Sequence, residues 1–329
     1  MSQGIELASL LAPVEPGLER MRAVISSALE ERSPAVADMT AHAARFRGKQ
    51  LRGALVLLAG QACGNPSQEL PEVAAVVELI HLATLVHDDI LDGASVRRRV
   101  ASVNHRWDNQ VAVLLGDFIY ARAFALSTEL SSRLCSRTLA RTTQRLCVGE
   151  IEQSARRYDF SIRPEDVEAI AAAKTASLYA SAAELGALYP QGDAALAAEF
   201  ERFGHEIGLA FQLVDDCLDL VGSEGELGKT AGIDAQDGKL TLPVILAYRA
   251  ASPRAQERIR NLFAGPDQER PRRLERLRLE CDLEAGVGQT LARARELVER
   301  ARGRLLKLPA SPARRALEEL GGFVLSRRF

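Results

Sequence analysis

The sequence of 329 residues is poor in aromatic residues, which account for 5% of it, and stretches that alternate β-branched with polar residues are hard to find. Strands of a half-buried sheet depend on both features, so their scarcity excludes a sheet as the main architecture. Ala, Leu, Arg and Glu are abundant instead, and these residues favour helices. We therefore expect an all-α protein.

Cysteine is also scarce, and the five cysteines are scattered without a Cys-x-x-Cys pair, at Cys63, Cys135, Cys147, Cys217 and Cys281. This pattern argues against a disulfide framework and a zinc site, and it predicts a reducing, cytoplasmic location. The first 20 residues contain no basic segment that is followed by an apolar core, so no signal peptide is expected.

Long uninterrupted apolar runs are absent as well. The longest candidate, 73–91, contains Glu78, His81, His87 and two aspartates, so it predicts a buried helix rather than a transmembrane segment. The net charge of −2 gives no sign of a surface that binds nucleic acid. With 47% hydrophobic residues, the chain has enough apolar material for a sizeable core.

Helical periodicity extends over most of the sequence. The expected helices span 18–32, 49–62, 70–92, 108–129, 133–155, 164–186, 193–221, 239–251, 253–264, 269–280, 285–305 and 311–325. No low-complexity linker and no change of composition divides the chain, so we expect a single domain over residues 1–329.

An Asp-Asp-x-x-Asp pattern occurs twice, at 88–92 and 215–219, each time after an apolar run. Its first and last aspartates are four residues apart, so they lie on one face of a helix. Carboxylates one turn apart suit Mg²⁺, which prefers oxygen ligands and shares them with phosphates and water. The candidate metal ligands are Asp88, Asp89, Asp92, Asp215, Asp216 and Asp219.

A solvated acidic helix end is the alternative explanation, and for one motif alone it would be equally good. For two motifs it is poor, because carboxylates at helix C-termini oppose the helix dipole and six facing carboxylates repel one another. The pair of motifs therefore predicts a site for a divalent cation, and phosphate groups of a ligand would complete the coordination of this cation.

Cations for such a phosphate ligand are present near both motifs. They are Arg97 and Arg98 after the first motif, Lys229 and Lys239 after the second, and Lys49 and Arg52 on one face of an earlier helix. Lysine is otherwise rare in this arginine-rich chain, with five among 42 basic residues. Four of the five, including Lys174, lie in the segments that carry motifs.

These segments resemble the trans-isoprenyl (polyprenyl) diphosphate synthase family, long-chain type, similar to octaprenyl and heptaprenyl diphosphate synthases. The matching motifs occur in the family's order: GKQLRG (48–53), ELIHLATLVHDDILD (78–92), RR (97–98), LLGDFIYARAF (114–124), GEIEQ (149–153), KTASL (174–178), GLAFQLVDDCLD (208–219), LGK (227–229) and DGKLTLP (237–243). They cover residues 45–250. The resemblance implies an isoprenoid-synthase helical bundle with a central active-site cavity, and a homodimer.

The resemblance also implies a role for each matching residue. Asp88, Asp92 and Asp215 would bind Mg²⁺ directly, with Asp89, Asp216 and Asp219 in support. Arg97, Lys174 and Lys229 would bind an allylic diphosphate, with Lys239 nearby, and Lys49, Arg52, His81 and Arg98 would bind isopentenyl diphosphate. Thr175 and Gln212 would face the developing allylic cation.

The reaction implied is a head-to-tail condensation. Mg²⁺ and the cations stabilise the leaving diphosphate, the isopentenyl double bond attacks the allylic cation, and the released diphosphate takes the proton. The pocket must exclude water, because the cation would otherwise be hydrolysed.

The chain length of the product is expected to depend on the helix that precedes Asp88. In the resembled family, bulky aromatics four and five residues before the motif stop growth early, and here those positions hold Thr84 and Ala83. Both are small, so we expect a long-chain all-trans product, from hexaprenyl to decaprenyl. A short-chain product, farnesyl or geranylgeranyl diphosphate, is the alternative.

Three departures from the family pattern stand out: Gly53 replaces the usual Pro, Arg99 replaces the usual Gly, and the basic C-terminus is only loosely matched by Arg327 and Arg328. Four further side chains are interpreted as structural, namely Glu150, Gln153, Phe118 and Tyr120.

Three rival functions were weighed. A class I terpene cyclase would carry a different second metal motif, and a generic Mg²⁺ phosphohydrolase would leave Lys174 and Gln212 unexplained. A non-catalytic subunit of a heteromeric synthase would typically have lost its acidic motifs, which are complete here. A peripheral membrane contact for product release is left open by the sequence.

Overall fold

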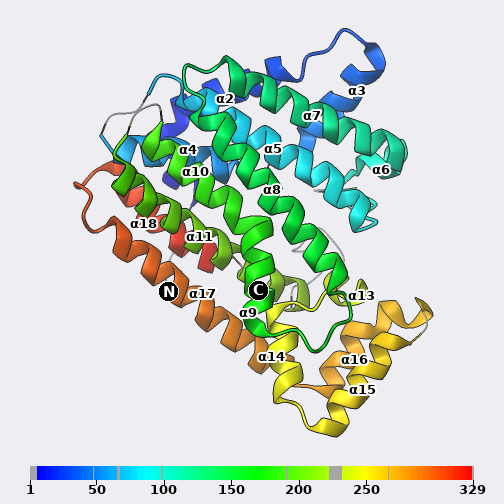
Figure 1. Ribbon diagram of the computed structural model, residues 1–329. Coiled ribbons are helices and arrows are strands. Elements are labelled where there is room, and N and C mark those ends of the chain that lie inside the picture. The colour runs from blue at the N-terminus through cyan, green and yellow to red at the C-terminus, as the bar shows by residue number, and fades with distance from the viewer. Residues whose placement is uncertain are drawn as a thin grey trace.

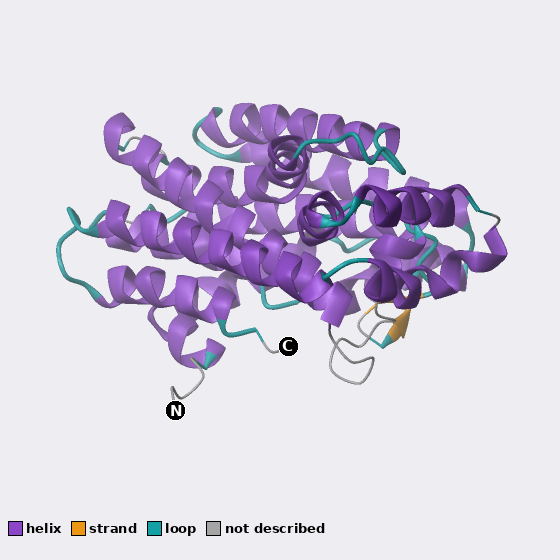
Figure 2. Cartoon of the chain, turned by 90° about the horizontal axis from the view of Figure 1, so that it is seen from below, coloured by secondary structure: helices purple, strands orange, loops and turns teal. Residues whose placement is uncertain are grey.

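The computed structural model describes residues 6–46, 48–64, 67–97, 99–189, 192–221, 232–265 and 267–327, and these form a helical bundle (Figure 1). The prediction of an all-α protein is confirmed. The described strands are β1 (Val96–Arg97) and β2 (Val100–Ala101), which pair antiparallel in a small hairpin at the edge of the otherwise helical molecule (Figure 2).

The helices follow one another along the chain with short connections. Their bounds are α1 Leu7–Leu11, α2 Glu15–Ala28, α3 Pro34–Ala43, α4 Leu51–Ala62, α5 Leu70–Leu91, α6 Val103–Arg106, α7 Asn109–Glu129, α8 Leu134–Ala155, α9 Pro164–Ala171, α10 Ser177–Leu188, α11 Ala194–Val221, α13 Ile233–Gln236, α14 Leu242–Ala250, α15 Pro253–Ala264, α16 Arg273–Glu280, α17 Leu283–Leu305 and α18 Pro312–Leu325.

The core is built around α4, α5, α10 and α11. These helices are apolar on most of their surface, and their side chains are largely buried in one hydrophobic cluster that includes residues from Leu10 to Val324. α5 packs on α7 and α4, and α10 packs on α11 and α4. The single-domain organisation expected from the sequence stays a prediction.

A π-helical turn, η3 (Ala172–Ala176), joins α9 to α10. The sequence predicted one continuous helix over 164–186, and the chain does stay helical there. A π turn holds one more residue than an α turn, so it changes the direction of the side chains that follow, and such turns are frequent at functional sites. Lys174 and Thr175 lie within this turn.

Several short elements were not predicted from the sequence, and α3 is the most consequential of them. Its residue His42 accepts a hydrogen bond at Nδ1 from Arg106 (2.9 Å) and lies 2.7 Å from the carbonyl oxygen of Ala101 through Nε2. Because a carbonyl only accepts, Nε2 must carry the proton. α3 thereby fixes the β-hairpin that follows the first acidic motif.

Two described helices, α5 and α7, are long and apolar enough to cross a membrane by length and composition alone. Core helices of soluble proteins meet the same criterion, and two thirds of the most apolar 18-residue stretch of α5 is buried inside the bundle. Only one third of the corresponding stretch of α7 is buried, so this helix presents apolar side chains at the surface.

The crossing of α4 and α10 predicts a clear effect on stability. A Cβ atom at Gly186 would lie 2.2 Å from the carbonyl oxygen of Val56, and a backbone atom cannot move away easily. Gly186→Ala should therefore lower the free energy of unfolding by about 1–3 kcal/mol, measured by urea denaturation.

The matched control for this prediction is Gly288→Ala. Gly288 lies within α17, and a Cβ there meets nothing within 4 Å. Alanine should therefore stabilise the protein by about 0.5–1 kcal/mol through its helix propensity. Equal effects of the two substitutions would show that the α4–α10 contact does not constrain the fold.

Candidate active site

The two acidic motifs lie at the C-terminal ends of α5 and α11, and side-chain contacts connect them. Lys239 Nζ donates a hydrogen bond to Asp92 Oδ1 (2.5 Å) and lies 3.7 Å from Asp234 Oδ1. The backbone N–H of Asp234 in turn donates to Asp219 Oδ2 (3.3 Å). The first and the second motif therefore belong to one site.

Asp88 is the most strongly perturbed carboxyl group of the first motif. Burial and, to a smaller extent, the nearby carboxylate of Glu150 raise its pKa, Lys174 and Arg97 lower it, and the net pKa is about 7. Such a carboxyl holds its proton near neutral pH because the protein alone does not compensate its charge. A bound cation would stabilise the charged form.

Asp89 is fully buried, at 0% exposure, and pairs with Arg97. Arg97 Nε and Nη2 each lie 2.7 Å from Asp89 Oδ1, and Oδ2 is buried without a hydrogen-bond partner among the described residues. Burial raises the pKa of Asp89, and Arg97 lowers it in part. Arg97, a predicted diphosphate ligand, is thus held beside the first motif.

Asn104 supports the same region, although no sequence motif pointed to it. Its Nδ2 donates to the backbone carbonyls of Asp89 (3.3 Å) and Ala94 (3.2 Å). These carbonyls lie at and just beyond the end of α5, where helix carbonyls need partners from outside the helix.

In the second motif, Asp215 forms an ion pair with Arg327 near the C-terminus. The guanidinium group of Arg327 also lies over the ring of Phe211, 4.3 Å from its centroid. The sequence left the role of Arg327 open, and the structure brings it to the second motif. Arg328 lies outside the described residues.

Asp216 is buried and accepts a hydrogen bond from Gln212 Nε2 (2.7 Å). Burial, with a contribution from Asp234, raises the pKa of Asp216 to about 8. Gln212 Oε1 also accepts a hydrogen bond from Thr175 Oγ1 (2.7 Å). A chain of hydrogen bonds therefore runs from the π-helical turn to the second motif.

Lys174 leaves the same turn toward α8. Its Nζ donates to Gln153 Oε1 (2.5 Å) and pairs with Glu150 Oε1 (2.6 Å). We interpreted Glu150 and Gln153 as structural from the sequence, and the structure places both in contact with a predicted site residue. The GEIEQ motif was the signal that could have found them.

Lys239 is 7% exposed, which is unusual for lysine. Burial by itself lowers the pKa of its ammonium group, but Asp234 and Asp92 raise it above its ordinary value. The ammonium is therefore charged, and it is placed between the two motifs.

The predicted isopentenyl diphosphate ligands are less closely connected. The Arg52 guanidinium group lies over the Tyr179 ring, 4.5 Å from its centroid. Burial raises the pKa of the Tyr179 phenol, Arg52 lowers it and Asp215 raises it. Both charged groups therefore lie near this phenol. Lys49 Nζ lies over the ring of Phe323 (4.8 Å), and His81 is half-buried on α5. Arg98 and Lys229 lie outside the described residues.

The donor set fits a hard cation. Asp88 is half-buried and Asp216 is buried, and both have raised pKa values. Asp89 Oδ2 is buried without a partner among the described residues. Across the described part of the chain, no group of three or more His, Cys, Asp or Glu side chains converges closely enough to hold a metal by itself. Mg²⁺ does not need one, because it often takes one or two carboxylates together with phosphates and water.

A family described as Polyprenyl synthetase matches residues 33–279 of this chain. The chain belongs to the polyprenyl synthetase family. It is therefore a prenyltransferase, and the resemblance stated from the motifs is confirmed.

Relatives and solved structures of this family align with most of the chain. It is 38% identical to a geranylgeranyl diphosphate synthase of Mycobacterium tuberculosis, over 73% of this chain and 74% of that one. It is 33% identical to an all-trans-nonaprenyl-diphosphate synthase of Rhodobacter capsulatus, over 97% of each. A polyprenyl synthase of Caulobacter crescentus, solved with calcium and isoprenyl diphosphate, superposes with a TM-score of 0.91 at 32% identity over the full length of both.

The two positions expected to control product length in this prenyltransferase lie on α5. Ala83 is fully buried, and Thr84 is half-buried with its hydroxyl bonded to the carbonyl of His81 (2.8 Å). Phe118 and Tyr120 are half-buried on α7, which packs against this helix.

Gly53 and Arg99, two of the departures from the family pattern, differ in their consequences. The backbone N–H of Gly53 donates to Glu78 Oε1 (2.8 Å), a bond that the usual proline could not make. Arg99 has a φ of 64°, a conformation that the usual glycine adopts more easily.

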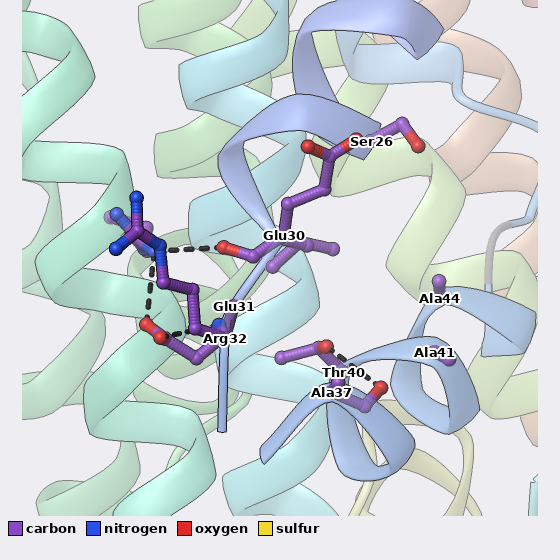
Figure 3. A pocket seen from close by; sticks show the side chains of 10 residues that line it. Ser26, Glu30, Glu31, Arg32, Ala37, Thr40, Ala41 and Ala44 are labelled. Atoms are coloured by element: carbon purple, nitrogen blue, oxygen red, sulfur yellow. Dashed lines mark hydrogen bonds and ion pairs between the residues drawn. The ribbon is translucent and has the colours of Figure 1, made fainter. Parts of the chain in front are cut away.

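Cavity size does not locate the site in this prenyltransferase. A cavity of 660 Å³ lies between α2, α3 and α7 and is lined by residues such as Ser26, Thr40 and Arg122 (Figure 3). No residue of the acidic motifs lines it. Charge and hydrogen bonding identify the active site instead.

The raised pKa of Asp216 predicts how the metal-free protein responds to pH. The folded protein binds this proton more tightly than the unfolded chain, where aspartates titrate near 3.8, so stability falls as the pH rises through about 8. Asp216→Asn removes the charge, and in chelator it should raise the free energy of unfolding at pH 9 by at least about 1 kcal/mol.

The gain should be smaller at pH 5, because the folded protein still holds the Asp216 proton there and only the ionisation of this group in the unfolded chain opposes folding. Urea denaturation at both pH values tests this, with Asp38→Asn as the control because the Asp38 side chain is 59% exposed. A gain from Asp216→Asn that is equal at both pH values would contradict the assignment.

Proposed function

We propose that this chain catalyses the Mg²⁺-dependent, head-to-tail condensation of isopentenyl diphosphate with an allylic prenyl diphosphate to give a long-chain, all-trans polyprenyl diphosphate. The observation that carries the proposal is the joining of two aspartate motifs through Lys239 and Asp234. This arrangement concentrates negative charge for a divalent cation and keeps an ammonium group beside it.

We assign the metal ligands to the two motifs. Asp88, Asp92 and Asp215 would hold Mg²⁺, supported by Asp89, Asp216 and Asp219. When bound, the ion neutralises charge on the leaving diphosphate of the allylic substrate. The related Caulobacter crescentus protein was solved with calcium, which supports a divalent cation here.

The basic side chains would divide between the two substrates. We assign Arg97, Lys174, Lys229 and Lys239 to the allylic diphosphate. Lys174 and Lys239 are paired with the carboxylates of Glu150 and Asp92. A diphosphate competes for such ammonium groups as a more highly charged partner, so binding would exchange one ion pair for another.

Isopentenyl diphosphate would occupy a second subsite formed by Lys49, Arg52, His81 and Arg98. No protein carboxylate is needed to remove the proton at the end of the reaction, since the released diphosphate can accept it.

Thr175 and Gln212 would face the developing allylic cation. The Thr175 hydroxyl donates a hydrogen bond to Gln212 Oε1, so the lone pairs of Thr175 Oγ1 can face a positive charge. Gln212 is itself fixed by Asp216. The pair therefore supplies preorganised oxygen dipoles at the place where charge develops.

A long product is proposed because Ala83 and Thr84 are small side chains on α5, one turn or more before Asp88. The relatives include a geranylgeranyl and a nonaprenyl diphosphate synthase, so the family itself allows both outcomes. A short-chain synthase is the alternative.

We propose that two copies associate through α7 and α8. These helices carry four of the exposed large apolar side chains of the described structure, Val113, Leu114, Val148 and Ile151. A cytoplasmic location is supported by the five unpaired cysteines. Peripheral membrane contact would assist release of a long apolar product.

Activity depends on the acidic motif and on Mg²⁺ under this proposal. Purified protein with labelled isopentenyl diphosphate, Mg²⁺ and farnesyl diphosphate should form long prenyl products, and EDTA should abolish them. Asp88→Ala should lower kcat/KM by at least about 10²-fold, since it removes charge stabilisation of the transition state. Asp38→Ala serves as the control, and full activity of Asp88→Ala would refute the site.

Product length tests the role of α5 separately. Thr84→Phe should shorten the main product to about the farnesyl or geranylgeranyl range, because a ring on the Asp88 face of α5 would block the path along which the prenyl chain is expected to grow. Thr84→Val removes the hydroxyl without adding bulk and should leave the length unchanged. Long products from a folded Thr84→Phe protein would place the tunnel elsewhere.

A further inference from the structure

Arg273, on α16, is a buried arginine at 1% exposure. No carboxylate of the described residues contacts its guanidinium group, and burying a guanidinium group is costly unless strong partners replace the water. The partners are two backbone carbonyls, Gln236 O (2.5 Å to Nη1) and Phe263 O (3.2 Å to Nη2), and two aromatic rings. The rings are those of Tyr158 (5.3 Å) and Phe263 (5.1 Å).

The first of these carbonyls lies close to the active site in the sequence. Gln236 is the last residue of α13, three residues before Lys239. Carbonyls in the last turn of a helix have no donor within the helix, so a donor from elsewhere fixes them. Arg273 supplies that donor from α16.

Tyr158 holds the same segment from the other side. Its backbone N–H donates to the carbonyl of Gly238 (3.0 Å), directly before Lys239. A Cβ at Gly238 would lie 2.1 Å from the Tyr158 ring, and Gly238 has a φ of 74°, so only glycine fits this contact. Tyr158 itself has a φ of 65°, an uncommon conformation for a non-glycine residue.

The segment held in this way connects both acidic motifs. Lys239 reaches Asp92 of the first motif, while the N–H groups of Gly232 (2.7 Å) and Asp234 (3.3 Å) donate to Asp219 of the second. A second arginine of α16, Arg278, donates to the carbonyl of Leu220 (2.6 Å), the residue that follows Asp219. α16 thus contacts the chain at Leu220, just after Asp219, and again at Gln236, three residues before Lys239.

We propose that Arg273, together with Tyr158, is a positioning residue that holds the 232–239 segment so that the Lys239 ammonium lies between the two acidic motifs. The hairpin of α15 and α16, which lies beside α13 at the end of the bundle, thereby acts on the active site without touching substrate (Figure 1). The proposal rests on the function assigned to Lys239 above.

A purely structural role for Arg273 makes a different prediction. If the side chain only filled the core, methionine would replace it without affecting Lys239, because its length is similar and its burial needs no partner. The orientation of Gln236 O requires a donor, which methionine lacks.

Arg273→Met is compared with Arg272→Met, which makes the same change at the exposed neighbouring residue. We expect Arg273→Met to lower kcat/KM for the allylic diphosphate by about tenfold or more, with most of the change in KM, as for a weakened binding group. Arg272→Met should stay within about twofold of the wild type. Arg273→Lys keeps a donor and should recover part of the loss.

A double-mutant cycle shows whether Arg273 acts through Lys239. In a Lys239→Met background, adding Arg273→Met should cost less than about twofold, because the group that it positions is already gone. If the two losses multiply in full, Arg273 acts independently of Lys239 and the proposal is wrong. If Arg273→Met does not fold, the same cycle is run with Arg273→Lys.

Hydrogen exchange separates this proposal from the proposed function. Amide exchange of peptides covering 232–239 should accelerate in Arg273→Met and stay at the wild-type rate in Arg272→Met, with no substrate present. Unchanged exchange in Arg273→Met would overturn the positioning role of Arg273 even in an active enzyme. If the wild-type protein condenses no primer while Arg273→Met still shows accelerated exchange, the proposed function is refuted and the positioning role stands.

Discussion

The repulsion among buried carboxylates at the ends of α5 and α11 is the constraint on which the rest of the site depends. Carboxylates taken out of water and placed near one another favour the protonated form unless positive charge is supplied. The protein's own groups meet this demand in two ways. Asp88 and Asp216 retain protons to higher pH, and Asp92 and Asp215 are paired with Lys239 and Arg327.

Each of those cations comes from a different part of the chain. Arg97 follows the first motif in a β-hairpin, Lys239 follows α13, and Arg327 comes from the last residues described. All of them are basic groups that a diphosphate could also engage. Under the proposed function, diphosphate binding would replace these ion pairs and so be coupled to rearrangement of these side chains.

The helical framework gives this site its rigidity. α5 and α11 are buried along most of their length, so the aspartates at their ends cannot separate without disturbing the core. The π-helical turn then directs Lys174 and Thr175 from a third helix toward the same place. Contacts from α16 hold the segment before Lys239, and so extend this support beyond the part of the chain that carries recognisable motifs.

The sequence by itself determined the fold class, most of the long helices and the family, because helical periodicity and ordered motifs are local properties of the chain. It also identified the aspartates, since two copies of one charged pattern are visible without a structure. It did not reveal the contacts of Glu150 or Asn104, or the π turn, because these depend on which helices pack together. Only the tertiary structure decided that Arg327 pairs with Asp215 and that Arg273 contacts the 232–239 segment, because these residues lie far apart in the chain. Folding removes water from such charged groups, and the partners that replace the water come from distant elements.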